Sequence, residues 1–245
     1  MKTTERHRLK TNEVAQTIAD LLARWEGSQR RILAAAVVVV VVAALVGGYF
    51  AWQQSRSARA QVLLAEAMAV AAAPVTSAAP AGTPPAPGAY FTERARAEAA
   101  LQKFQQVAAT YGSTKEGVAA RFEAAGLLAS LGRTAEAERE FRTLAERDAS
   151  SVYGRMARLG LAEVQVQAKQ YDAAVATFRE LAGKTDGEIP VDGVLMRLAR
   201  AYQLAGRPSE ALQTLTRVVE QFPDSLYAAE ARREVQALKA PGRAS

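Results

Sequence analysis

An apolar pattern that recurs every 37 residues constrains this chain more than any other feature. Each copy pairs a small residue with a large one four positions later: Ala100 with Phe104, Ala137 with Phe141, Ala174 with Phe178, and Ala211 with Leu215. Three positions farther on, a second register repeats with the same period: Val107, Leu144, Leu181 and Val218. Residues three and four apart share one face of a helix. The period therefore predicts stacked helical hairpins, and an unrelated Ala-rich bundle is the alternative.

The last copy carries the fullest pattern: Leu198, Ala199, Tyr202, Gly206, Ala211, Leu215 and Pro223. It resembles the tetratricopeptide repeat, in which Leu-Gly-x2-Tyr is followed by a Gly turn, Ala-x3-Phe and a closing Pro. Gly206 suits the end of a first helix and Pro208 the start of a second. The middle copies keep part of the pattern: Ala124, Ala125, Leu128 and Gly132 in one, Leu161, Ala162, Gln165 and Lys169 in the other. The resemblance implies an all-α fold, an α-solenoid of hairpins, with the extra residues of the longer period lying between repeats, for example around Gly183 to Asp192.

Residues 32–52 carry no charge and include six consecutive valines, Val37 to Val42. As a helix this segment would be about 31 Å long, which is enough to cross a bilayer. A cleaved signal peptide is the alternative, but its apolar stretch would be shorter and its basic lead would be brief. A core helix of a soluble protein would show one apolar face, whereas this segment is apolar all round. Inside it, Ala43-x3-Gly47 and Ala44-x3-Gly48 form a small-x3-small pattern that suits packing on another membrane helix.

Positive charge predicts the orientation of this anchor. The leader contains seven basic residues, Lys2, Arg6, Arg8, Lys10, Arg24, Arg30 and Arg31, whereas the 20 residues after the span contain only Arg56 and Arg59. Lys and Arg are retained on the cytoplasmic side. The sequence therefore predicts a single-pass protein of a bacterial inner membrane, with a cytoplasmic N-terminus and an extracytoplasmic repeat domain.

The rest of the chain divides around the span. In the leader, residues 1–31, an amphipathic helix from Thr11 to Gly27 places Val14, Ile18, Leu21, Leu22 and Trp25 on one stripe, either to dock a cytoplasmic protein or to lie on the lipid headgroups. Residues 53–72 are expected to form the outer helix of the first repeat, and residues 73–89 a Pro/Ala-rich loop that replaces its tight turn. Residues 90–225 hold the TPR-like repeats, and residues 226–245 a capping helix and tail.

Composition argues against an enzyme. The chain has no cysteine and one histidine, His7, so thiolate and most zinc chemistries have no residues to use. Acidic residues such as Glu136, Glu138 and Glu140 lie at helical spacing near Arg142, as on a solvated ion-pair face. We therefore expect no catalytic residues, no metal site, no cofactor and no small-molecule substrate. The net charge of +6 is not concentrated in the repeats, which argues against nucleic acid as a partner.

The concave surface of a helical solenoid is lined by the first helix of each repeat. The tetratricopeptide domains that grip a carboxylate tail place Lys, Asn and Arg there; the matching positions here are Phe122, Gly126, Met156, Leu159, Glu163, Met196 and Arg200. Without the carboxylate-binding set, this surface suits apolar or extended protein segments. Packing of Phe122, Leu159 and Met196 between helices is the alternative.

The layout of leader, span and repeats is similar to that of the ancillary subunit of the SecYEG translocon and of related membrane-anchored tetratricopeptide proteins. That resemblance implies a non-enzymatic, chaperone-like adaptor whose partners are translocon subunits, secreted or envelope proteins, or periplasmic chaperones. The alternatives are a structural scaffold for cell-envelope or division complexes and the non-catalytic assembly subunit of an enzyme.

Overall fold

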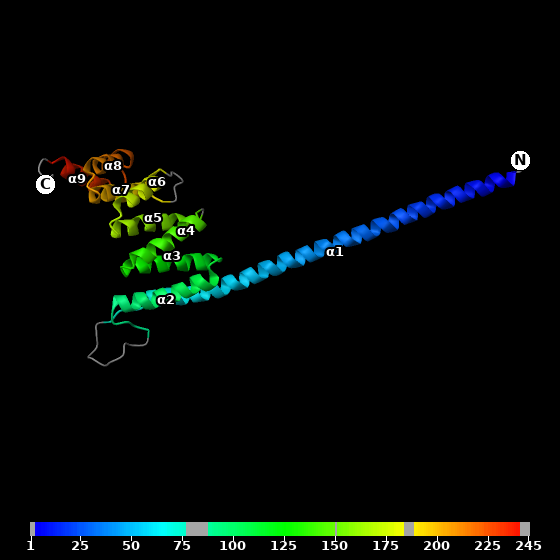
Figure 1. Ribbon diagram of the computed structural model, residues 1–245, viewed down its shortest axis with the longest axis horizontal. Coiled ribbons are helices and arrows are strands. Elements are labelled where there is room, and N and C mark those ends of the chain that lie inside the picture. Colours follow the sequence, from blue (N-terminus) through cyan, green and yellow to red (C-terminus); the bar gives the residue numbers. More distant parts are fainter. Residues whose placement is uncertain (1–2, 77–87, 150, 184–188, 241–245) are drawn as a thin grey trace. The chain divides into compact units, whose positions relative to one another are not determined.

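The computed structural model describes residues 3–76, 88–149, 151–183 and 189–240, with side chains from residue 33 onward. Over these residues the regular structure is helical, which confirms the all-α class. The chain forms two compact units, Met1–Ser55 and Arg56–Ser245. The helices are α1 (Thr3–Ala71), α2 (Glu93–Tyr111), α3 (Lys115–Ser130), α4 (Thr134–Arg147), α5 (Val152–Gln167), α6 (Tyr171–Ala182), α7 (Val191–Leu204), α8 (Pro208–Gln221) and α9 (Ala228–Lys239) (Figure 1).

The first unit contains the leader and the apolar segment within α1. The prediction that a leader helix ends at Gly27 is wrong, because α1 continues through this residue. A glycine inside a helix costs only about 1 kcal/mol relative to alanine and does not end a helix without a following stop signal. The side chains of the predicted amphipathic stripe, and that of His7, lie outside the described residues.

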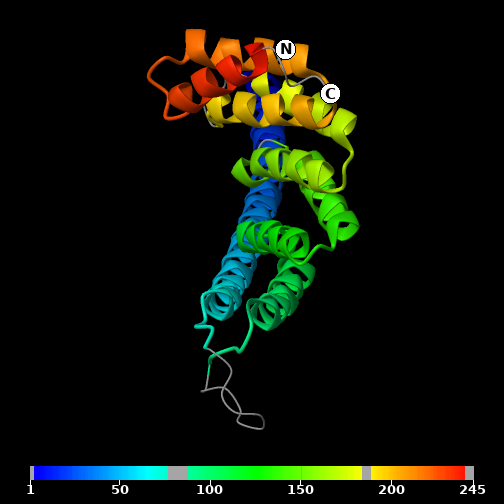
Figure 2. The same cartoon turned by 90° about the vertical axis from the view of Figure 1, so that its left-hand side faces the viewer.

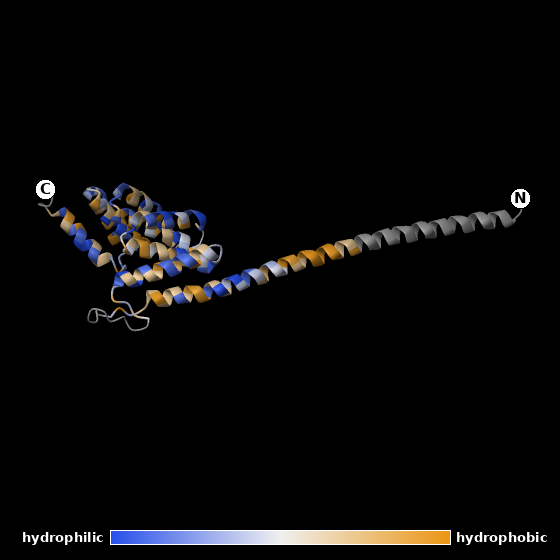
Figure 3. Ribbon diagram, turned by 60° about the horizontal axis from the view of Figure 1, so that its bottom comes forward, coloured by the Kyte–Doolittle hydropathy of each residue, from blue (hydrophilic) through white to orange (hydrophobic). Residues whose placement is uncertain are grey.

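From Leu33 to Trp52 every side chain of the first unit is exposed, and hydrophobic residues follow one another along the helix (Figure 3). Among the described residues, one stretch is long and apolar enough to cross a membrane by length and composition, and it begins at Leu33. This stretch is a candidate membrane span.

The second unit is a stack of antiparallel hairpins. Residues 56–71 of α1 pair with α2, and the pairs α3–α4, α5–α6 and α7–α8 follow, each packed on the next (Figures 1 and 2). The recurring Ala and Phe or Leu positions of the second helices are 0–4 % exposed, and the positions of the second register are 0–6 % exposed. Each 37-residue period therefore corresponds to one hairpin, which contributes the same positions to the core.

The turn inside each of the last three hairpins uses a residue with positive φ, and these residues also recur every 37 positions: Gly132 at 78°, Lys169 at 60° and Gly206 at 71°. After each of them, a backbone N–H donates to the carbonyl five residues earlier, as in Arg133 to Leu128 at 2.9 Å and Arg207 to Tyr202 at 2.8 Å. This is the Schellman arrangement that ends a helix and satisfies its last carbonyls. Pro208 begins α8, where its missing N–H costs nothing.

The first hairpin has an insertion where the other hairpins have a tight turn. Its described ends are held together: the N–H of Thr76 donates to the carbonyl of Tyr90 at 2.9 Å, and the N–H of Tyr90 donates to the carbonyl of Pro74 at 3.0 Å. Arg96 on α2 donates to the carbonyl of Ala73 at 3.2 Å. Residues 77–87, which include most of the Pro/Ala-rich segment, lie outside the described residues. The insertion therefore leaves the pairing of the two helices intact.

Helix α9 continues the repeat pattern. Ala120, Ala157, Val194 and Ala231 are spaced 37 residues apart on α3, α5, α7 and α9, and each is at most 1 % exposed. The expected capping helix is thus equivalent in position to the first helix of a further repeat.

Candidate protein-binding surface

The predicted binding positions lie on α3, α5 and α7, the first helices of the last three hairpins. Phe122 is partly buried, and its ring lies 5.7 Å from the rings of both Phe141 and Tyr153. Leu159 and Met196 are partly buried and pack against the core of the last two hairpins. These three side chains contribute mainly to packing between helices.

An ion pair joins α5 and α7 on this surface. The Nε of Arg197 on α7 lies 2.7 Å from Oε1 of Glu163 on α5, and both side chains are partly exposed. One layer farther on, Gln203 donates from Nε2 to Oε2 of Glu234 on α9 at 3.0 Å. Polar contacts thus join the three successive first helices α5, α7 and α9 into one surface. Exposed pairs of this kind contribute at most about 1 kcal/mol each, so their main effect is to fix side-chain positions.

Met156 and Arg200 remain available to solvent. Met156 is 41 % exposed and lies two turns before Glu163 on α5, and Arg200 is exposed one turn after Arg197 on α7. Sequence reasoning missed Val152, which is 58 % exposed and lies one turn before Met156. The sequence could have indicated Val152, because Val152 and Met156 have the i, i+4 spacing of residues on one helix face. The surface therefore combines an apolar patch on α5 with basic side chains on α7.

Three acidic residues of α4 are engaged in surface ion pairs. Arg133 contacts Glu136 at 2.7 Å, Arg142 contacts Glu138 at 2.6 Å, and Arg121 contacts Glu140 at 3.6 Å. The hydrogen bond from Arg133 holds the pKa of Glu136 below its ordinary value. A lowered pKa keeps a carboxylate ionised, which is unsuited to general acid catalysis at neutral pH.

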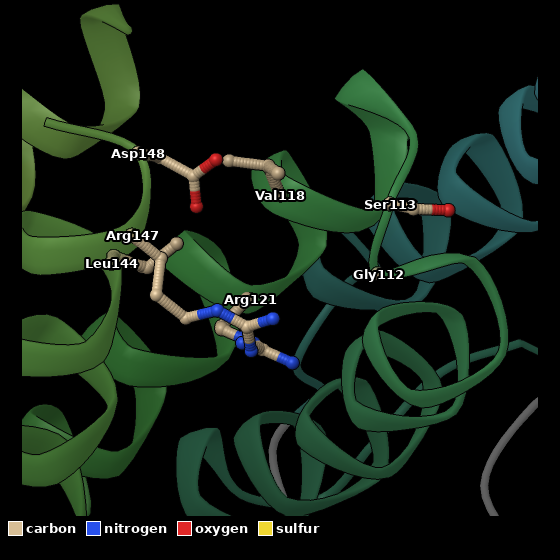
Figure 4. A pocket seen from close by; sticks show the side chains of 7 residues that line it. All are labelled: Gly112, Ser113, Val118, Arg121, Leu144, Arg147 and Asp148. Carbon is tan, nitrogen blue, oxygen red and sulfur yellow. The ribbon is translucent and has the colours of Figure 1, made fainter. Parts of the chain in front are cut away.

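A small hollow of about 190 Å³ lies where the α2–α3 turn meets the end of α4. Figure 4 shows the guanidinium groups of Arg121 and Arg147 beside it, with the carboxylate of Asp148 across from them. Ser113 is the single hydroxyl in its lining, and Asp148 is the single carboxylate. Among the described residues no group of His, Cys, Asp and Glu is placed to hold a metal ion. The lining of the hollow contains neither histidine nor cysteine.

Comparison with known proteins identifies the repeat type. The family model described as "Tetratricopeptide repeat-like domain" matches residues 25–185 and 92–232. Its first match begins before the apolar segment and extends through the insertion. None of the curated proteins matches this chain in sequence.

Solved structures agree on the fold. A crystal structure of nearly identical TPR-like repeats from Podosopora anserina, described as kinesin light chain repeats, is 18 % identical with a TM-score of 0.52, covering 60 % of this chain and 78 % of that one. The apo form of RapI is 13 % identical with a TM-score of 0.50, covering 60 % of this chain but 44 % of that protein. At these identities the likeness extends to the fold alone.

Proposed function

Because the chain belongs to the tetratricopeptide repeat-like domain family, we propose that it is a non-enzymatic, membrane-tethered adaptor that binds protein partners outside the cytoplasm. Repeats of this family generally mediate protein–protein interaction. The proposal rests on the surface of α5, α7 and α9, where Met156 and Val152 expose apolar area on α5 and Arg197 and Arg200 lie on α7. Apolar contacts flanked by charge suit an extended or helical segment of another protein.

The tether is supported by α1. Between Leu33 and Trp52 its large apolar side chains are about half to two-thirds exposed, a condition that water disfavours and a bilayer satisfies. The excess of Lys and Arg before the segment supports an N-terminus in the cytoplasm. A compartment-dependent reporter fused after Ser245 tests this orientation. Activity of a reporter that works only outside the cytoplasm would support this orientation. Activity of a reporter that works only in the cytoplasm would overturn it.

The proposed place of action is the Sec translocon or another site of envelope protein biogenesis, where the adaptor would hold emerging chains or periplasmic chaperones. The order of leader, apolar segment and repeats, which resembles that of the ancillary translocon subunit, supports this location. Affinity purification of the full chain in mild detergent, followed by mass spectrometry, provides the test. Recovery of translocon subunits or secreted proteins supports the proposal; recovery of division or envelope-scaffold proteins alone would replace it with the scaffold function.

The binding surface is tested with two charge-matched double variants. Met156→Glu with Arg200→Glu alters the exposed positions, whereas Ala135→Glu with Arg139→Glu makes the same charge change on exposed positions of α4. Met196 is a poor choice because it packs against the core, so a charge there would unfold the last hairpins. The first variant should lose the captured partner and the second should keep it. Equal capture by both, with intact helicity, would contradict the assignment of this surface.

A further inference from the structure

The first helix of the array has two faces with opposite environments. Toward α2, Ala60 and Ala67 are fully buried. On the opposite face, Ala58, Val62, Ala65 and Ala69 are exposed, and Val62 is 69 % exposed. We refer to these four residues as the heptad face. It carries no polar side chain, although the outer face of a terminal repeat is ordinarily polar.

The heptad face is spaced by alternating steps of four and three residues, the a and d positions of a seven-residue repeat. In this register Val62 and Ala69 are a positions, Ala58 and Ala65 are d positions, and the buried Ala60 and Ala67 are f positions, on the far side of the helix. In the sequence the same spacing continues upstream, and it meets no charged residue: Val37, Val41, Ala44, Gly48, Ala51 and Ser55. A seam sustained over this length is typical of two helices that run side by side.

We propose that the heptad face pairs with the heptad face of a second copy of this chain, in parallel and in register. The inference rests on the proposed function in one respect: anchors of one orientation in one membrane bring identical faces together at the same height. Such a contact is isologous and closes as a dimer. Tethering to one membrane also raises the effective concentration of each copy for the other. A contact made by small residues is therefore enough to form the dimer.

The side chains favour this occupant. A β-branched residue at an a position, as at Val62, suits a parallel pair, and alanine at the d positions lets the two backbones approach closely. The charged neighbours Arg59 and Glu66 occupy e positions, whereas the g positions hold Gln54, Gln61 and Met68. A parallel pair brings the g positions of one helix beside the e positions of the other. No like charges therefore meet across the seam.

The absence of cysteine from the sequence makes the test direct, because each introduced cysteine is unique. Full-length variants Val62→Cys, Ala65→Cys and Ala69→Cys are oxidised in native membranes, beside the control Ala109→Cys, an exposed alanine on α2 of the same hairpin. We expect a disulfide-linked dimer of the chain at the heptad face, about fivefold or more above the control. Dimer yield equal to that of Ala109→Cys, or adducts with a different protein at these positions, overturns the proposal.

A second variant distinguishes specific pairing from random collision between chains in the membrane. Val62→Glu in the Ala69→Cys background places a buried charge in the seam, and should reduce the dimer to the level of the control. Because Val62 faces away from α2, the hairpin stays folded, which circular dichroism verifies. Alkaline extraction of the same membranes tests the membrane anchor separately. Release of the chain by alkali would contradict the anchor. A chain that stays in the membrane but forms no dimer would contradict only the pairing.

Discussion

The two ends of the hairpin array are finished differently. At the C-terminal end, α9 packs on α8 and buries Ala228 and Ala231, so the chain itself covers the last layer. At the N-terminal end, residues 56–71 of α1 form the first layer and leave the heptad face exposed. A solenoid needs a cover at both ends because each layer presents an apolar face to the next. Helix α9 therefore covers the last layer, whereas the first layer leaves the apolar heptad face exposed.

The same two ends also differ in how a hairpin is closed. The last hairpin turns through Gly206 and Pro208, whereas the first contains an insertion whose base is tied by hydrogen bonds between residues 74–76 and Tyr90. Both hairpins nevertheless bury the alanine and the large apolar residue of the repeat. The facing surfaces of the two helices therefore determine the pairing, and the connection between them can vary.

The largest effect should come from placing a charge at the covered end. Ala231→Asp puts an unpaired carboxylate at a position that is 0 % exposed and should destabilise the array by about 3 kcal/mol. Ala65→Asp makes the same change on the heptad face, where water can reach it, and should cost well under about 1 kcal/mol in the unit 56–245. Urea unfolding followed by circular dichroism measures both. Equal losses would show that the two ends are covered alike.

A second comparison concerns the junctions between hairpins. Gly117 and Gly154, 37 residues apart, each follow a capping hydroxyl that accepts from the glycine N–H, Thr114 at 3.1 Å and Ser151 at 2.9 Å. A Cβ on Gly154 would lie 2.0 Å from the carbonyl oxygen of Asp148, and one on Gly117 would lie 1.9 Å from that of Tyr111. The junction before α7 has Val191 at the equivalent position, after a longer connection. The tight junctions therefore depend on glycine and the longer one does not.

We expect Gly154→Ala to destabilise the array by about 2–3 kcal/mol, because the backbone must shift to admit the methyl group. Gly126→Ala is the matched control, since its Cβ would meet nothing within 4 Å. It should stabilise α3 by about 0.5–1 kcal/mol through helix propensity. Thermal unfolding of both variants tests the difference, and a neutral Gly154→Ala would show that the junction relaxes freely.

The fold could be predicted from the sequence because large residues carry information that alanine does not. Phe104, Phe141 and Phe178 recur among polar residues, so their period was visible. The register of Ala120, Ala157 and Ala231 was not seen, because alanine is common on every face of these helices as the best helix former. The family model and the solved structures confirm the repeat type.

The candidate surface was less predictable. Family positions located Met156 and Arg200, which are exposed, together with Phe122, Leu159 and Met196, which are largely used in packing. The pairing of Glu163 with Arg197 depends on two flexible side chains 34 residues apart on adjacent layers, and no local pattern encodes such a contact. Whether a side chain in a solenoid is exposed depends on the next hairpin that packs over it. The sequence of its own helix does not determine this exposure.

The three equivalent turns permit a smaller test. Lys169 adopts a φ of 60° where the neighbouring hairpins use glycine, and a side chain in this region costs roughly 1–2 kcal/mol. Lys169→Gly should therefore stabilise the array, by about 0.5–1 kcal/mol after the greater freedom of glycine in the unfolded chain is included. Gly206→Ala is the reverse change and should destabilise by about 1 kcal/mol. Opposite shifts in the urea midpoint support this account, and a loss of stability in Lys169→Gly would contradict it.

The smallest effect is expected where α1 is fastened to α3. Glu116 accepts from Ser57 at 2.9 Å and from Gln61 at 3.1 Å, so one carboxylate ties the first layer to the second. Burial opposes its ionisation, but hydrogen bonds from its own backbone, Gln61 and Ser57 outweigh burial and hold its pKa below the ordinary value of 4.5.

A carboxyl group whose pKa is lowered by folding adds stability that is complete above its unfolded pKa and is lost as the pH falls through the folded value. Stability of the unit 56–245 should therefore decline below about pH 4.5, the ordinary carboxyl value. Glu116→Gln should reduce that decline, whereas Glu123→Gln, an exposed position on the same helix, should leave it unchanged. Urea midpoints between pH 3 and pH 7 measure the slopes. Equal declines in the unsubstituted chain and in Glu116→Gln would contradict this account.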